Sequence, residues 1–163
     1  MRRHLLAAMA ASLLGASLVS IVMAAETQTV AVDLKTFKFP DGKQDLFGFN
    51  EGEGKLFFYT NGTATATVKV PEEGDYEITI KASCDPALNE RAKFKLTIDG
   101  QLVGKETLLT ADDAKDYKFT TNFKKGDHKL AIEFTNDVYK EGEYDRNLYV
   151  HEVTLQQKAK GKR

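Results

Sequence analysis

The chain has 163 residues, and its 23 basic and 24 acidic residues give a formal net charge of −1. This balance lacks the basic excess by which proteins bind nucleic-acid phosphates, so we expect no nucleic-acid partner. The single cysteine, Cys84, cannot form an internal disulfide, and the fold must therefore rest on its hydrophobic core.

The first residues have the pattern of a secretory signal peptide. A short basic stretch at 1–4 precedes an apolar run rich in Ala and Leu at 5–25, and the small residues Val22 and Ala24 favour cleavage after position 24. Cleavage removes Arg2 and Arg3, which takes the 23 basic residues to 21 against 24 acidic ones, a charge of −3. We expect a secreted protein, extracellular or periplasmic, with no stable membrane anchor. An uncleaved membrane span is the alternative, but the Ala and Ser residues of this run lower the hydrophobicity that a stable membrane span requires.

Beyond residue 30 the hydrophobic residues alternate with a period of two, which is typical of half-buried strands. The pattern predicts nine strands, at 30–37, 56–60, 65–70, 76–80, 94–98, 102–109, 117–123, 128–134 and 148–155. A helical turn is expected only at 111–115.

Glycine-containing turn sequences separate these runs. Asn61-Gly62 predicts a type I′ hairpin, and the turns at 73–75, 99–100 and 125–127 are expected to close other strand pairs. Because Asn61-Gly62-Thr63 is explained as a turn, its match to a glycosylation acceptor carries little weight.

Short strands at this spacing predict one all-β domain at 25–157, an antiparallel β-sandwich of the jelly-roll kind, followed by a basic tail at 158–163. The predicted core comprises Val68, Val70, Ile78, Ile80, Phe94, Leu96, Ile98, Leu130, Ile132, Phe134, Val150 and Val153.

One segment is longer and more acidic than a connection between two strands requires. Residues 135–147 contain four carboxylates, and oxygen-rich loops of this kind suit calcium, which takes six to eight oxygen ligands. Asp137 and Asp145 are the natural anionic pair. A second polar loop, at 83–91, could supply Asp85, Asn89 or Glu90 as further ligands of the metal if the two loops meet. A solvated acidic turn without a metal is the alternative.

Two strings within this region, FTND at 134–137 and DRNLYV at 145–150, resemble the signature of the calcium-dependent xylan-binding modules, carbohydrate-binding module families 36 and 60. The resemblance implies a β-jelly-roll in which loop aspartates hold calcium and neighbouring hydroxyls of a sugar fill the open positions. It implies metal ligands at Asp137 and Asp145, a supporting group at Asn136 or Asn147, and an arginine, Arg146, that orients a carboxylate.

The expected function is thus calcium-dependent binding of a xylan-like, galactan or cellulose-like polysaccharide. Because the chain has no tryptophan, an aromatic face for a sugar ring has to come from tyrosine. The expected sugar contacts are Tyr139, Tyr144, Glu143, Asn89 and Glu90. A calcium-stabilised structural or adhesion domain is the alternative. An enzyme is not expected, because Glu141 and Glu143 have no partner groups that indicate an acid and a base across a cleft.

Overall fold

The computed structural model describes residues 29–39 and 45–159. The predicted signal peptide and the last residues of the basic tail lie outside this part of the chain. All elements of the described part are β-strands except a short 3-10 turn, η1 (Leu34–Thr36). No helix in the described part is long and apolar enough to cross a membrane.

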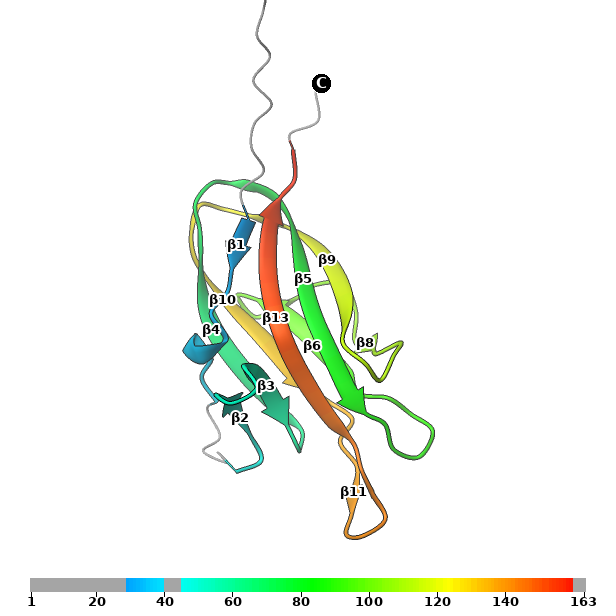
Figure 1. Cartoon of the computed structure of the whole chain (residues 1–163). Coiled ribbons are helices and arrows are strands. Elements are labelled where there is room, and N and C mark those ends of the chain that lie inside the picture. Colours follow the sequence, from blue (N-terminus) through cyan, green and yellow to red (C-terminus); the bar gives the residue numbers. More distant parts are fainter. Residues whose placement is uncertain (1–28, 40–44, 160–163) are drawn as a thin grey trace, which may run out of the picture.

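The strands form two antiparallel sheets packed face to face, which confirms the predicted all-β sandwich (Figure 1). The larger sheet has the order β2-β3-β13-β5-β9, and β1 also pairs with β13. Its strands are β1 (Thr29–Ala31), β2 (Phe47–Asn50), β3 (Lys55–Phe58), β5 (Gly74–Asp85), β9 (Lys115–Phe123) and β13 (Asn147–Gln157). The smaller sheet has the order β4-β10-β6-β7, with β8 also on β6. Its strands are β4 (Gly62–Val70), β6 (Lys93–Ile98), β7 (Gln101–Leu102), β8 (Thr107–Leu108) and β10 (Gly126–Phe134).

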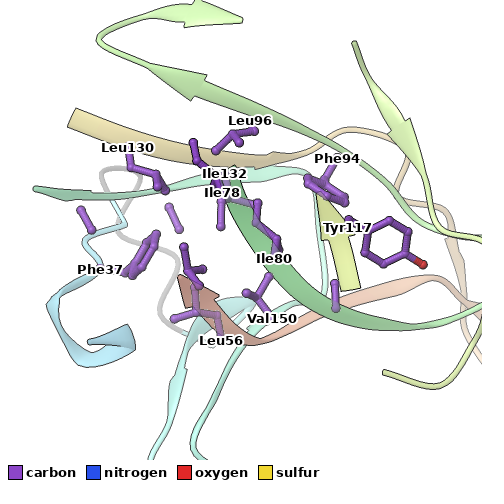
Figure 2. Packing of buried hydrophobic residues seen from close by; sticks show 14 of the residues in the cluster. Phe37, Leu56, Ile78, Ile80, Phe94, Leu96, Tyr117, Leu130, Ile132 and Val150 are labelled. Carbon is purple, nitrogen blue, oxygen red and sulfur yellow. The ribbon is translucent and has the colours of Figure 1, made fainter. Parts of the chain in front are cut away.

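The core lies between the two sheets, where alternate residues of each strand point inward. Every residue predicted for the core is buried in one continuous cluster. Figure 2 shows Ile78 and Ile80 of β5 together with Leu130 and Ile132 of β10 in this layer. Burial of such a side chain stabilises the fold by about 1.5–3 kcal/mol relative to exposure, so this layer can hold the sandwich together without a disulfide.

The turns differ in part from the prediction. The turn at Asp99-Gly100 closes a hairpin between β6 and β7, and both residues have positive φ, 50° and 79°, as a type I′ turn requires. The hairpin predicted at Asn61-Gly62 is wrong, because β3 and β4 lie in different sheets and do not pair. The turns at 73–75 and 125–127 likewise cross between the sheets. The prediction failed because local turn residues specify a change of direction and not the partner strand.

Other elements also differ from the prediction. The predicted strand at 30–37 is β1 followed by η1, where Asp33 caps the turn by accepting a hydrogen bond from the Lys35 backbone N–H at 3.0 Å. The predicted strand at 102–109 is divided into β7 and β8, with Gly104 at φ 75° between them. The acidic segment is itself partly a hairpin of β11 (Tyr139–Lys140) and β12 (Tyr144–Asp145). This hairpin extends beyond one end of the sandwich (Figure 1).

Candidate functional site

Strand β13 presents a row of polar side chains at the end where the acidic segment lies. Asn147 and Tyr149 alternate with Leu148 and Val150, which are buried in the core, and Asp145 at the end of β12 lies two residues before Asn147. Because successive residues of a strand point to opposite faces, Asn147 and Tyr149 share one side of the sheet, and Asp145 lines the same pocket as they do.

These three side chains line a pocket of about 590 Å³, which we call the end pocket. The other walls come from the residue before β2, from the two residues after β3, and from the acidic segment. The full lining is Leu46, Tyr59, Thr60, Asp137, Tyr139, Asp145, Asn147 and Tyr149.

Three side-chain oxygens of the end pocket are buried and accept no hydrogen bond: Oδ1 of Asp137, Oδ1 of Asp145 and Oδ1 of Asn147. Leaving one buried polar atom unpaired costs about 1–3 kcal/mol, and more for a charged group. Such orphaned oxygens, two of them on carboxylates, are the donor set that a hard cation takes. Among the described residues no three Asp, Glu, His or Cys side chains gather in a metal-binding group. The three unpaired oxygens here belong to two carboxylates and one amide, that of Asn147. The set therefore fits calcium, which accepts amide oxygens, and not zinc.

The electrostatics of Asp137 agree with this geometry. Burial raises the pKa of the Asp137 carboxyl, a hydrogen bond with Thr60 opposes the rise, and the neighbouring Asp145 carboxylate adds to it. Two partly buried carboxylates that repel each other are stabilised by a cation between them.

The end pocket is held open by hydrogen bonds behind it. The Asn147 amide nitrogen donates to Oδ2 of Asp145 and to Oδ2 of Asp85, both at 3.1 Å, which leaves the amide oxygen facing the other way. The Tyr149 hydroxyl also donates to Oδ2 of Asp85, at 2.6 Å. Burial, together with the Asp85 carboxylate, raises the pKa of Tyr149, so the hydroxyl keeps its proton. Asp85 thus positions the oxygen of Asn147 and does not line the end pocket.

Arg146 joins the two polar loops. The residue is 4% exposed, and its side chain donates to the backbone carbonyls of Ala87 at 2.6 Å, Glu90 at 3.0 Å and Asn136 at 2.5 Å. The carboxylate nearest to its guanidinium is that of Glu90, at 3.4 Å. Arg146 therefore fixes the backbone that precedes Asp137, while the Asn61 side chain accepts from the Asp137 backbone N–H at 2.8 Å.

Aromatic rings surround the end pocket. Tyr59 meets the edge of Tyr149 with ring centroids 6.2 Å apart and packs on Phe57 at 4.9 Å. The Lys55 ammonium lies 4.1 Å from the centre of the Tyr149 ring. Tyr139, on the hairpin, is 63% exposed. Exposed tyrosines beside a polar pocket are suited to contact the apolar face of a sugar ring.

Of the residues predicted for the site, Asp137, Asp145, Asn147 and Tyr139 line the end pocket together. The others lie around it and have their own partners. The Asn136 amide is bound to backbone groups of Arg91 and Lys93 at 2.9 and 2.6 Å. Asn89 occupies a turn with φ 59°, Glu90 pairs with Lys93, Glu143 pairs with Lys140 at 2.5 Å, and Tyr144 is opposite Lys140 in the hairpin.

Sequence reasoning missed Leu46, Tyr59, Thr60 and Tyr149 as lining residues. Tyr149 could have been found, because it follows Asp145 and Asn147 at the two-residue spacing of a strand. Tyr59 and Thr60 carry no local signal. They reach the site only because β3 pairs with β13 across a large separation in sequence.

Comparison with known proteins identifies the family of the chain. Residues 77–163 match CBM60, the family described as a Ca-dependent, xylan-binding carbohydrate-binding module. No curated protein matches the chain.

Solved structures share the fold at low sequence identity. The CBM36-1 domain of a multidomain xylanase from the hindgut metagenome of Trinervitermes trinervoides superposes with a TM-score of 0.61 and 14% identity, covering 82% of this chain and 99% of that one. The C-terminal CBM6 of LamC, a laminarinase from Zobellia galactanivorans, has a TM-score of 0.56 and 10% identity, covering 80% and 100%. A CBM36 module in complex with calcium and xylotriose has a TM-score of 0.51 and 17% identity, covering 80% and 99%.

The family match covers more than half of the chain and includes all four of the predicted residues that line the end pocket. The protein is accordingly a binding module and not an enzyme, and it belongs to carbohydrate-binding module family 60.

Proposed function

We propose that this protein is secreted and binds a xylan-like polysaccharide through a calcium ion held in the end pocket by Asp137, Asp145 and Asn147. The observation that carries the proposal is the set of three buried oxygens without hydrogen-bond partners. A calcium ion would supply the missing positive charge and open coordination positions that sugar hydroxyls can occupy.

The protein's own residues prepare this site before a ligand arrives. Asp85 fixes the Asn147 amide, Arg146 fixes the backbone before Asp137, and Asn61 holds the Asp137 N–H. A site with its oxygens already in place loses little conformational entropy on binding. The hydrogen bonds behind the pocket therefore contribute to affinity by keeping the oxygens in place.

The sugar specificity would come from two kinds of contact. Two neighbouring hydroxyls of fixed geometry can replace waters on a cation, which selects a diol without a deep cavity. Tyr59, Tyr139 and Tyr149 offer aromatic surface beside the pocket. The CBM36 structure solved with calcium and xylotriose supports xylan as the first glycan to test, with galactan and cellulose as alternatives.

The location follows from the first part of the chain. The pattern of residues 1–24 supports export by a cleaved signal peptide, and we place the mature protein outside the cell or in a periplasm.

The test is retention of the mature protein on insoluble xylan, galactan and cellulose, with calcium or with excess chelator. Wild type is expected to be retained on xylan only with calcium. Asp145→Ala should lose retention. Glu141→Ala, a matched control at an exposed position of the same hairpin and outside the pocket lining, should keep it. Calcium that raises the melting temperature without retention on any glycan would instead identify a calcium-stabilised structural domain.

A further inference from the structure

A second pocket, which we call the side pocket, adjoins the end pocket and shares the Tyr149 side chain with it as a lining residue. It has a volume of about 520 Å³. Its walls come from β3, β5, β13 and the segment before β9, and they comprise Lys55, Ser83, Cys84, Asp85, Pro86, Asp112, Asp113, Ala114, Tyr149 and His151. Asp85 lies between the pockets, since it lines the side pocket and binds Asn147 and Tyr149.

The polar groups of the side pocket suit sugar hydroxyls. The Ser83 hydroxyl and Nε2 of His151 are 2.7 Å apart and form one hydrogen-bonded pair on neighbouring strands. Lys55 stands on the other side, held against the Tyr149 ring and 2.8 Å from the Glu53 carboxylate. A hydroxyl group both donates and accepts, so it can bind to a lining that mixes carboxylates, an ammonium group and a serine–histidine pair.

The charge of the side pocket is negative. Three carboxylates line it, those of Asp85, Asp112 and Asp113, against the single ammonium of Lys55. Arg91 pairs with Asp112 at 2.7 Å and offsets one of the three. Burial lowers the pKa of His151, and Lys55 and Lys81 lower it further, so the imidazole is neutral near pH 7. A sugar that carries a carboxylate would meet repulsion here, whereas a neutral sugar would not.

On the basis of the proposed function, we propose that the side pocket receives the next residues of the same polysaccharide chain, and that its carboxylates select neutral residues over uronic acids. The geometric basis is the shared Tyr149 wall, which allows a chain anchored at the end pocket to continue along the outer face of β13. The module would then recognise a short stretch of unbranched or neutrally substituted chain and not a single diol alone.

The first test measures the dependence of affinity on ligand length. Neutral xylo-oligosaccharides from disaccharide to hexasaccharide are titrated calorimetrically into the mature protein with saturating calcium. Wild type should bind the hexasaccharide about threefold to tenfold more tightly than the disaccharide, which corresponds to one or two additional net hydrogen bonds. His151→Ala should bind the disaccharide like wild type and lose most of the gain with length.

The second test measures selectivity for charge. Wild type should prefer the neutral hexasaccharide over one that carries a glucuronic acid branch. Asp113→Lys, at an exposed position, should reduce or reverse this preference. Asp127→Lys is the matched control, because Asp127 is exposed and lies opposite Lys69 in the ladder of β10 and β4, at the end of β10 away from both pockets.

The outcomes separate the two proposals. Equal affinity for disaccharide and hexasaccharide in wild type, or no change of preference in Asp113→Lys, would overturn the role of the side pocket while the calcium site stands. Failure of every oligosaccharide to bind in calcium would overturn the proposed function, and the side-pocket proposal with it.

Discussion

Arg146 illustrates how a single residue organises the site without lining it. A guanidinium presents five N–H donors in a planar fork, and here it serves three backbone carbonyls from two loops. Lysine has no such fork and could not satisfy the three carbonyls in the same way. The residue that the resemblance assigns to the orientation of a carboxylate thus connects loop backbones, and its nearest carboxylate is Glu90.

His128 lies in a different setting, near the end of the sandwich opposite the end pocket. Its Nδ1 faces the Asp99 carboxylate at 2.6 Å and its Nε2 faces the Lys124 carbonyl at 2.8 Å. Both partners are acceptors, so both ring nitrogens must carry a proton, and the ring is then a cation. The hydrogen bond to Asp99 raises the pKa of His128, burial opposes the rise, and the carbonyl of Lys124 and the charge of Asp127 support it.

This arrangement predicts a pH dependence of stability. A histidine whose folded pKa exceeds its unfolded value of about 6.5 contributes stability that is complete below that value and is lost as pH rises through the folded pKa. The melting temperature of wild type, measured in chelator between about pH 5 and about pH 9, should therefore lose this contribution toward the alkaline end. His128→Gln should be less stable at the acidic end of this range and lack the loss. His151→Gln is the control that should retain it. An identical pH profile for wild type and His128→Gln would contradict the account.

At the scale of elements, the crossing from β3 to β4 shows why a glycine follows Asn61. Gly62 has no positive φ to explain it. A Cβ at this position would lie 2.9 Å from Cε1 of Phe47, whose ring is 1% exposed and fixed in the core. The glycine is therefore required by close approach of the two sheets and not by turn geometry.

We predict that Gly62→Ala lowers the free energy of unfolding by about 1–3 kcal/mol, because the buried ring has to move. Gly54→Ala is the comparison. Gly54 has φ 65° and no atom within 4 Å of an added Cβ, so only the backbone strain of about 1 kcal/mol applies. Urea unfolding in excess chelator measures both. A smaller loss for Gly62→Ala than for Gly54→Ala would show that the ring adapts.

The strands and the core could be predicted because alternation of apolar residues is a local property. Ile78, Ile80, Leu130 and Ile132 are buried as their spacing predicts. Strand pairing is not local, and Asn61-Gly62 wrongly predicts a hairpin because no residue near it indicates that β4 pairs with β10. The candidate site divides in the same way: Asp137, Asp145 and Asn147 lie within one segment, whereas Tyr59 and Thr60 join them only through the pairing of β3 with β13.

At the scale of the whole molecule, the sandwich separates its functions along its length. The end pocket and side pocket lie where β5 ends and β13 begins, with β10 ending near them. His128 and its partners Asp99 and Lys124 lie near the start of β10, at the other end of the continuous core. Substitutions at the His128 end that alter stability should therefore leave the oxygens of the end pocket in place, since distant sites with no shared partners usually act independently.

The central claim is that sugar and calcium meet at the same oxygens, and reciprocal coupling tests it most directly. Calcium affinity of the mature protein is measured by calorimetry with and without saturating neutral xylohexaose. If sugar hydroxyls occupy positions on the ion, the sugar must raise calcium affinity by the same factor by which calcium raises sugar affinity. The account predicts this equal rise. A calcium affinity that does not change when the sugar is bound would contradict it.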